Sequence, residues 1–465
     1  MPAKEQQSMG NEAPGMSPTE RRASISLAAI MATRMLGLFM IFPVFSLYAK
    51  SLPDSSPLLI GLAMGVYGLT QAIFQIPFGR ASDRFGRRRM ITIGLLIFAL
   101  GSVAAASADT IMEIIFGRAL QGIGAVAAVI MALTADLTRE EQRTKAMAII
   151  GMSIGSAFML ALVIAPLLNG WIGVSGIFWF TAILALLALL ILWTLVPEPA
   201  QSHMHHDAEL DPGLTMSVLK DTQLLRLDAG IMILHTIITA IFIVVPFVLR
   251  DSLGIEGEMH SWVYAVVLVL SAGAMVPFII IAEKKRKMKQ IFVGAVTVLG
   301  VALFGMSQWY EVSLIFFVLF WLFFTAFNFL EASLPSLVSK TAHAARKGTA
   351  MGVYSSSQFL GAFIGGTTGG WLYGELGISS VFMFLAGLIV VWWLLAITMR
   401  PPLYLANIIM PVSGLDETQA IELAAKLETV PGVVEAVVII EENEVYLKVD
   451  NQLLDRDALQ SALPS

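Results

Sequence analysis

The sequence predicts an all-α membrane protein with twelve transmembrane helices in two six-helix bundles, followed by a small α+β domain. Of its 465 residues, 57% are hydrophobic and only 14% are charged, and the mean hydropathy is +0.78. A soluble domain carries about 25% charged residues, so this composition indicates a chain that crosses the membrane many times. Long apolar windows recur up to residue 399, and the composition changes after Arg400.

Each apolar window is long enough to cross a hydrocarbon core about 30 Å thick, which takes about 20 helical residues. Bundles at 24–196 and 223–400 are separated by a polar cytoplasmic linker at 197–222. The helices are expected at 24–50, 58–80, 89–108, 110–137, 143–170, 174–196, 223–250, 258–282, 288–308, 311–339, 346–374 and 378–399. The polar residues 1–23 predict a disordered tail, and the first helix is too long for a signal-peptide core.

The 29 lysines and arginines predict which helix ends face the cytoplasm. The loops on one side hold 18 of them, the amino-terminal tail holds three, and the region from Arg400 onward holds four. The loops on the other side hold only Lys50 and Arg250, while Arg34 and Arg118 fall inside the membrane. Because cytoplasmic loops carry an excess of lysine and arginine, both termini are expected in the cytoplasm.

Residues 79–89 join two of these helices and contain five arginines and one acid. Gly79 and Gly86 permit close helix approach and a tight turn. Asp83 can face a helix amino terminus, where partial positive charge favours an anion. The segment therefore predicts more than a positively charged loop.

Arg87 can bridge two carboxylates in fork geometry, and Asp136, at the end of the fourth helix, is a plausible partner. Arg139, one turn further on, competes for the same carboxylate. Arg88 and Arg89 need no explanation beyond membrane topology.

The two halves also repeat. Residues 145–147 align with 349–351, and residues 165–171 align with 365–371 once a four-residue gap is allowed. A parallel repeat about 200 residues apart places the halves around an axis normal to the membrane. A central substrate path between the halves is the expected consequence.

Ionisable groups at membrane depth are costly, by about 2.5 to 3.5 kcal/mol for a charge at the helix centre, so each is a functional candidate. The candidates for proton coupling or the substrate path are Arg34, Arg118, Asp228, His235, Asn328 and Glu331. Glu331 is the strongest candidate for carrying a proton, because a carboxyl group in a low-dielectric environment can be loaded and unloaded near neutral pH. His235 titrates near physiological pH, although a hydrogen bond between helices would also explain it. Arg34 contacts either an anionic substrate or a backbone carbonyl, and Gln121 and Gly122 favour a functional role for Arg118.

Residues 406–465 alternate like soluble structure and predict the order βαββα. A strand near 408–412 precedes a helix opened by Asp416, with Gln419 placed as in a capping box. Strands follow near 433–441 and 444–450, and then a second helix. This domain has 11 acidic and three basic residues, a charge of −8, against +3 for residues 1–405.

No cofactor or metal site is expected. The chain has no cysteine, which excludes disulfides and thiolate metal sites. The linker tract at 203–207, His-Met-His-His-Asp, could bind Ni²⁺, Cu²⁺ or Zn²⁺, but such flexible tracts more often bind nothing specific. No phosphate-binding glycine-lysine loop occurs, so ATP-driven transport is not predicted. A membrane transporter, and not an enzyme, is the expected class.

Three segments resemble motifs of one known family. Residues 79–89 resemble the signature loop of the major facilitator superfamily, and residues 118–125 resemble a motif of its proton-coupled members. The segment with Ala165, Pro166, Asn169 and Gly170 is similar to a motif of its 12-helix drug/proton antiporters, which has glycine where Ala165 and Asn169 stand. The resemblance covers about residues 24–400.

The resemblance implies a proton-driven efflux antiporter of small organic or drug-like solutes in the bacterial inner membrane, working by alternating access. It also implies that Gly79, Asp83, Gly86, Arg87 and Asp136 form a conformational latch, closed in the outward-open state with Asp83 against the start of the eleventh helix. The alternatives are a proton symporter that imports a metabolite and a transporter-derived sensor. The expected partners are the lipid bilayer, protons and a small-molecule substrate, with no nucleic acid.

The carboxy-terminal domain resembles the ferredoxin-like heavy-metal-associated domain. Glu417 and Ala420 stand where that family has its two cysteines, so soft-metal binding by that route is lost. We expect this acidic domain either to dock on the positively charged cytoplasmic loops of the same chain or to be tethered without contacts.

Overall fold

The computed structural model describes residues 15–198, 216–343, 346–401, 406–412, 414, 416–440, 444–450 and 453–462. Most of the expected amino-terminal tail lies outside the described residues. The same is true of the histidine-containing tract in the linker.

Ten helical segments of the described chain are long and apolar enough to cross a membrane. One of them, Lys145–Thr194, lies within α7, whose 55 residues are divided into two spans by Gly173, with φ 67° and ψ 177°. A further long helix, α13, is rich in glycine, serine and threonine and completes the predicted set of twelve. The helices are α1 Pro18–Phe39, α2 Phe42–Ala49, α3 Pro57–Phe85, α4 Arg87–Ala106, α5 Ile111–Ile123, α6 Ala127–Asp136, α7 Glu140–Thr194, α9 Thr222–Phe247, α10 His260–Lys284, α11 Met288–Trp309, α12 Ser313–Thr341, α13 Lys347–Leu376 and α14 Ile378–Ile397.

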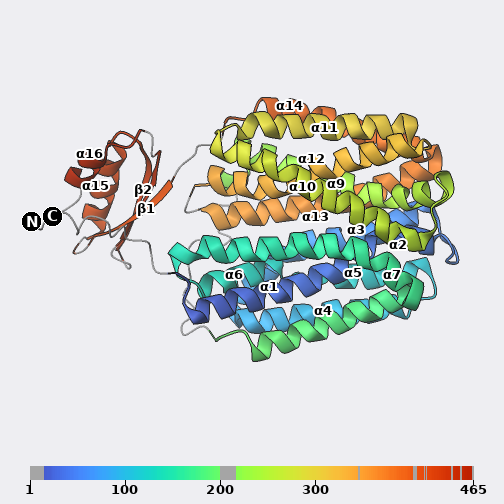
Figure 1. The fold of residues 1–465 in the computed structure, drawn as a ribbon. Coiled ribbons are helices and arrows are strands. Elements are labelled where there is room, and N and C mark those ends of the chain that lie inside the picture. Colours follow the sequence, from blue (N-terminus) through green and yellow to red (C-terminus); the bar gives the residue numbers. More distant parts are fainter. Residues whose placement is uncertain are drawn as a thin grey trace, which may run out of the picture.

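The long helices run side by side and form two groups (Figure 1). Helices α1, α4, α5, α6 and α7 lie in the lower group, and α10, α11, α12 and α14 lie in the upper group. The small carboxy-terminal unit lies beyond one end of the bundle. The two-bundle architecture is therefore confirmed.

Two expected helices are broken, and one starts earlier than predicted. The first begins at Pro18, not at residue 24, because Ser17 and Glu20 form a capping box, and it breaks after Phe39. The helix expected at 110–137 breaks between α5 and α6, at residues 124–126. A Cβ atom on Gly124 would lie 2.3 Å from the carbonyl oxygen of Gly94, so this break lets the α5–α6 junction approach α4 closely.

The charged segment at 79–89 turns on one residue. Helix α3 continues to Phe85, α4 begins at Arg87, and Gly86 between them has φ 95° and ψ 137°. Side chains disfavour this conformation, which explains the glycine. Residues 81–85, expected in a loop, are therefore the last turns of a helix. We call the end of the bundle that carries this turn the hairpin end, and the opposite end the far end.

Helix α13 packs between α3 of the first half and α9 of the second through two rows of glycine. A Cβ atom on Gly61 of α3 would lie 2.0 Å from the carbonyl oxygen of Gly366 of α13. On the other face of α13, a Cβ atom on Gly365 would lie 2.1 Å from the carbonyl oxygen of Thr236 of α9. Such small-residue rows let transmembrane backbones touch. The two halves are thus in direct backbone contact toward the far end.

The carboxy-terminal unit has the predicted βαββα order. Its elements are β1 Ala406–Pro411, α15 Glu417–Glu428, β2 Val433–Ile439, β3 Glu444–Val449 and α16 Arg456–Ala462. The three strands form an antiparallel sheet in the order β1-β3-β2. The capping box of Asp416 and Gln419 is present, and Leu427, Val445 and Leu447 are buried in the unit's core.

Candidate functional site

At the hairpin end, the guanidinium of Arg87 lies between two acids. Arg87 forms an ion pair with Asp83, one turn earlier across Gly86, and its Nε lies 3.2 Å from Oδ2 of Asp136. It also donates to Ser82 Oγ at 2.6 Å. The side chains of Arg87 and Asp136 are only 9% and 1% exposed. We call Asp83, Arg87 and Asp136 the charge cluster.

The competitor for Asp136 has another partner. Arg139 forms an ion pair with Glu20 at the start of α1, with Nε 2.9 Å from Oε1. Asp136 keeps one oxygen, Oδ1, without a hydrogen-bond partner among the described residues. Thr349, at the start of α13, is buried, and its contact with Asp83 stays a prediction.

Arg88 does more than mark the topology. Its guanidinium lies 4.7 Å from the ring centroid of Trp193, donates to the carbonyl of Leu192 at 3.0 Å and pairs with Glu198. These contacts fasten the end of α7 to the start of α4. The sequence signal for this role was the tryptophan near the end of an apolar helix.

In the first half, two buried arginines enclose Tyr67 of α3. One terminal nitrogen of Arg34 donates to Tyr67 Oη at 2.7 Å, to Gln71 Oε1 at 2.7 Å and to the carbonyl of Gly124 at 3.3 Å. The guanidinium of Arg118 also lies near this residue, 5.2 Å from the ring centroid of Tyr67. Neither arginine has a carboxylate within ion-pair distance in the described chain.

The two arginines differ in how many of their guanidinium nitrogens have hydrogen-bond partners. All three nitrogens of Arg118 are bonded: Nε to the carbonyl of Ala63, Nη1 to Gln121 Oε1 at 3.0 Å and Nη2 to the carbonyl of Met64. Arg34 has the expected bond to a backbone carbonyl, yet its Nε and Nη1 lack partners among the described residues. Both explanations offered for Arg34 therefore keep support.

The sequence analysis missed the polar residues of α3 near these arginines. Tyr67 and Gln71 accept hydrogen bonds from Arg34, and Gln71 donates to Gln75. Tyr67, Gln71 and Gln75 are buried along α3 at intervals of four residues. This spacing puts them on one face of the helix, and it was the available signal.

In the second half, three helices bring a histidine, an acid and an amide together. His235 Nδ1 of α9 lies 3.9 Å from Glu331 Oε2 of α12, and the amide nitrogen of Gln358 of α13 lies 2.8 Å from His235 Nε2. The Glu331 side chain is 36% exposed and that of His235 is 13% exposed. One nitrogen of His235 thus makes a contact between helices, and the other faces an acid.

Several polar atoms of α9, α12 and α13 are buried and have no hydrogen-bond partner among the described residues. They are Asp228 Oδ2, His235 Nδ1, Glu331 Oε2 and Tyr354 Oη. Both Glu331 and Asp228 interact electrostatically with Tyr354. Asn328, expected beside Glu331, donates to Ser271 of α10 at 3.1 Å instead. Unpaired buried polar groups are rare in proteins and call for water, a proton or a ligand. We call Asp228, His235, Glu331, Tyr354 and Gln358 the acid–histidine cluster.

The segment similar to the antiporter motif lies in the first span of α7. Ala165 and Pro166 are buried, and Asn169 and Gly170 are exposed near the far end. A Cβ atom on Gly170 would lie 4.0 Å from Oε1 of Glu258, in the short helix that precedes α10. The motif therefore borders the second half at the far end.

Known proteins with a similar sequence or fold are membrane transporters. A family model described as Major Facilitator Superfamily matches residues 27–366 and 227–409. The inner membrane transport protein YajR of Escherichia coli is 43% identical over 453 residues, which cover 96% of this chain and 98% of YajR. The multidrug resistance protein MdtH of Yersinia pestis is 26% identical over 364 residues, 76% of this chain and 88% of MdtH. The solved structure of the proton:xylose symporter XylE has a TM-score of 0.63 at 17% identity and covers 83% of this chain and 96% of XylE.

Proposed function

We propose that this chain, which belongs to the major facilitator superfamily and is a secondary transporter of that kind, exports small organic solutes in exchange for protons. The observation that carries the proposal is the acid–histidine cluster, where Glu331 lies 3.9 Å from His235 and remains 36% exposed. A buried acid with access to water can take up a proton and release it again. The efflux direction is supported by the likeness to a protein named for multidrug resistance.

The surroundings of Glu331 support coupling of proton uptake to transport, because the charged and the protonated carboxyl group are stable in different environments. A charged carboxylate at membrane depth requires water or a cation, whereas the protonated form can be enclosed in a dry interior. Its Oε2 has no hydrogen-bond partner among the described residues, so no fixed donor holds the charged form in place. Proton uptake would therefore favour closure around the site, and proton release would favour opening.

The two ends of the bundle are suited to opening in turn. The far end is held by backbone contact between glycines of α3 and α13, and the hairpin end carries the charge cluster. Backbone contact depends on how closely the helices pack, whereas ion pairs depend on charge. The two ends can therefore open under different conditions, as alternating access requires. We propose that the hairpin end faces the cytoplasm of an inner-membrane protein, because most lysines and arginines lie there.

The direction of transport is tested by flux in proteoliposomes with an imposed pH gradient and a panel of organic cations, anions and neutral compounds. For antiport, addition of a substrate moves protons against the direction of the solute. A symporter moves both in the same direction, and a sensor moves neither. Solute and proton flux in the same direction would overturn the export proposal.

Symport is the second candidate, and one observation favours it. Ala165 and Asn169 occupy positions that are glycine in the antiporter motif, and Asn169 is exposed at the far end. The fold is shared with a proton:xylose symporter, so the architecture alone does not separate the two directions.

We further propose that the ferredoxin-like carboxy-terminal domain docks on the transporter. Three contacts support docking: Arg286 to Asp450 at 3.4 Å, His343 to Glu435 at 3.1 Å, and Lys448 to the carbonyl of Ala342 at 3.4 Å. Within the sheet, Lys448 also pairs with Glu435 at 2.8 Å. The three docking contacts join the sheet to the loops after α10 and α12. Ala420 offers no metal ligand, which favours a docking role over metal binding.

Because these contacts are largely ionic and partly exposed, salt is expected to loosen them. A spin label on a cysteine at the exposed Ser461 should become more mobile as salt rises from low to molar concentration. A label on the membrane helices, for example at Gln290 of α11, is the matched control and should not change. Mobility of the domain that is high and independent of salt would contradict docking.

A further inference from the structure

We propose that Glu20 is a positioning residue for the charge cluster: it holds Arg139 away from Asp136, so that Asp136 stays paired with Arg87. The inference rests on the proposed role of the charge cluster in the transport cycle. It assigns a part in that cycle to the cytoplasmic start of the first helix.

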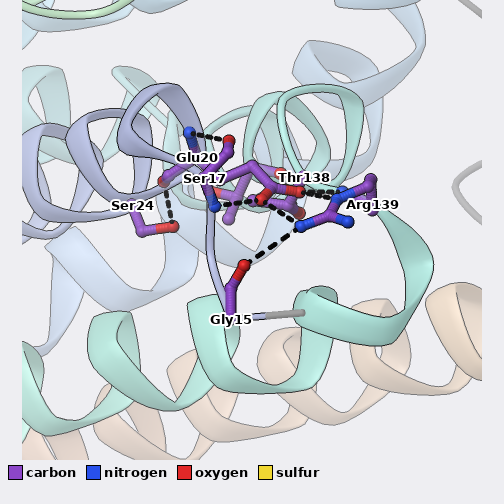
Figure 2. Close-up of polar contacts among 7 residues, drawn as sticks. Gly15, Ser17, Glu20, Ser24, Thr138 and Arg139 are labelled. Carbon is purple, nitrogen blue, oxygen red and sulfur yellow. Dashed lines mark hydrogen bonds and ion pairs between the residues drawn. The ribbon is translucent and has the colours of Figure 1, made fainter. Parts of the chain in front are cut away.

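Glu20 accepts hydrogen bonds from two segments that lie far apart in the sequence (Figure 2). Within the first turn of α1, the backbone nitrogen of Ser17 donates to Oε2 at 2.7 Å. From the junction between α6 and α7, Arg139 donates its backbone nitrogen and Nε to Oε1 and its Nη2 to Oε2, each at 2.9 Å. The two residues are 119 positions apart, and Glu20 is 5% exposed.

These contacts exceed what a helix cap requires. A capping-box glutamate needs only to receive the nitrogen of its own N-cap residue, and glutamine serves equally well. Here the carboxylate also meets the guanidinium in two-pronged geometry, which is the strongest arrangement for this pair. The negative charge of Glu20 is therefore explained by Arg139 and not by the cap.

Asp136 is the alternative partner for Arg139. It ends α6, three residues before Arg139, the N-cap residue of α7, and its side chain is 1% exposed. Arg87 bonds only Oδ2, and Oδ1 has no hydrogen-bond partner among the described residues. A second guanidinium released close by in the chain would find an open acceptor on a buried carboxylate, where charge attraction is strong.

Capture of Asp136 by Arg139 would change the charge cluster. Arg87 would then share one of its two acids with a competing cation, and its hold on Asp136 would weaken. Glu20 prevents this by giving Arg139 a carboxylate of its own. The start of α1 is thereby linked to the state of the hairpin end.

The test uses the full chain in proteoliposomes and reads conformation, not flux. Because the chain has no cysteine, spin labels can be placed on single cysteines at Arg89 of α4 and Gln290 of α11, both exposed, one in each half. Glu20→Gln, which keeps the cap but not the charge, is expected to raise the population with a separated hairpin end roughly tenfold, as for the loss of one charge-assisted hydrogen bond. Arg139→Gln alone should leave the distance distribution as in the parent protein.

The decisive variant is the double substitution Glu20→Gln with Arg139→Gln, which removes the competitor and should restore the parent distribution. A double variant that behaves like Glu20→Gln alone would overturn the inference. Ser17→Ala is the matched control, because it weakens the cap and leaves Glu20 facing Arg139. It should lower the melting temperature without moving the distance.

Asp83→Asn separates failure of this inference from failure of the underlying proposal. It should separate the hairpin end by itself, since it removes one acid of the charge cluster. If Asp83→Asn shifts the distance and Glu20→Gln does not, only the role of Glu20 is wrong. If neither shifts it, the charge cluster does not control this end.

Discussion

Two buried charged sites, Arg118 in the first half of the membrane domain and the acid–histidine cluster in the second, differ in how far their polar atoms are satisfied. In the first half, every nitrogen of Arg118 is bonded to an amide or carbonyl oxygen, whereas Arg34 keeps Nε and Nη1 without hydrogen-bond partners among the described residues. In the second half, the acid–histidine cluster leaves oxygen and nitrogen atoms unpaired, and Glu331 is 36% exposed. A satisfied charge fixes geometry, whereas an unsatisfied one with access to water can exchange a proton.

The difference has a chemical origin. A guanidinium carries five donors in a planar fork and stays charged, so neutral oxygens of neighbouring helices can satisfy it permanently. A carboxyl group and an imidazole change their charge near neutral pH when their surroundings allow it. The surroundings of Arg118 are therefore expected to act as a rigid support, and the acid–histidine cluster as the part that responds to protons.

Glu331→Gln should have the largest effect on this contrast. The amide cannot carry a proton, so uphill transport driven by a pH gradient should fall by roughly a hundredfold, as when a proton-transferring group is removed. Uptake or efflux in proteoliposomes, measured at matched protein amounts, checks this. Glu311→Gln, in the exposed loop between α11 and α12, is the control and should transport at the rate of the parent protein. Full uphill transport by Glu331→Gln would place proton coupling elsewhere.

Arg118→Gln should affect stability and transport together. Loss of three hydrogen bonds from a buried cation is expected to lower the free energy of unfolding by about 3 kcal/mol. Thermal unfolding in detergent, recorded beside the flux assay, separates this from the behaviour of Glu331→Gln. An Arg118→Gln protein with an unchanged melting temperature and no proton coupling would break the contrast between Arg118 and the acid–histidine cluster and give Arg118 a direct functional role.

Asn328→Ala should have the smallest effect. Asn328 is one turn from Glu331 but bonds Ser271 of α10, so its loss should cost about 1 kcal/mol of stability and leave transport within about twofold. The same two assays measure it. A loss of transport as large as that of Glu331→Gln would extend the acid–histidine cluster to α10.

Local signals in the sequence were sufficient for much of the fold. Apolar windows gave the membrane helices, and the alternation after Arg400 gave the βαββα order. Gly86 marked a turn that only glycine adopts readily, with φ 95°. The early start of α1 was also encoded locally, by Ser17 and Glu20, but was overlooked beside the stronger apolar signal that follows.

Other features are contacts between helices, and no local sequence pattern predicts which residues make them. The sequence predicted Glu331 and His235 as ionisable groups at membrane depth, and Asp136 and Arg139 as neighbours. The sequence did not identify Gln358 as the partner of His235, Glu20 as the partner of Arg139, or the glycines of α13 as the contact between the halves. Helical periodicity states which face a residue occupies, but the helix that meets that face is decided by packing.

By itself, the sequence thus determined the membrane class, the number of helices and the residues able to carry charge, since these follow from composition and spacing. The tertiary structure alone decided which charges are satisfied, because hydrogen bonds are short and directional and join residues as distant as Glu20 and Arg139.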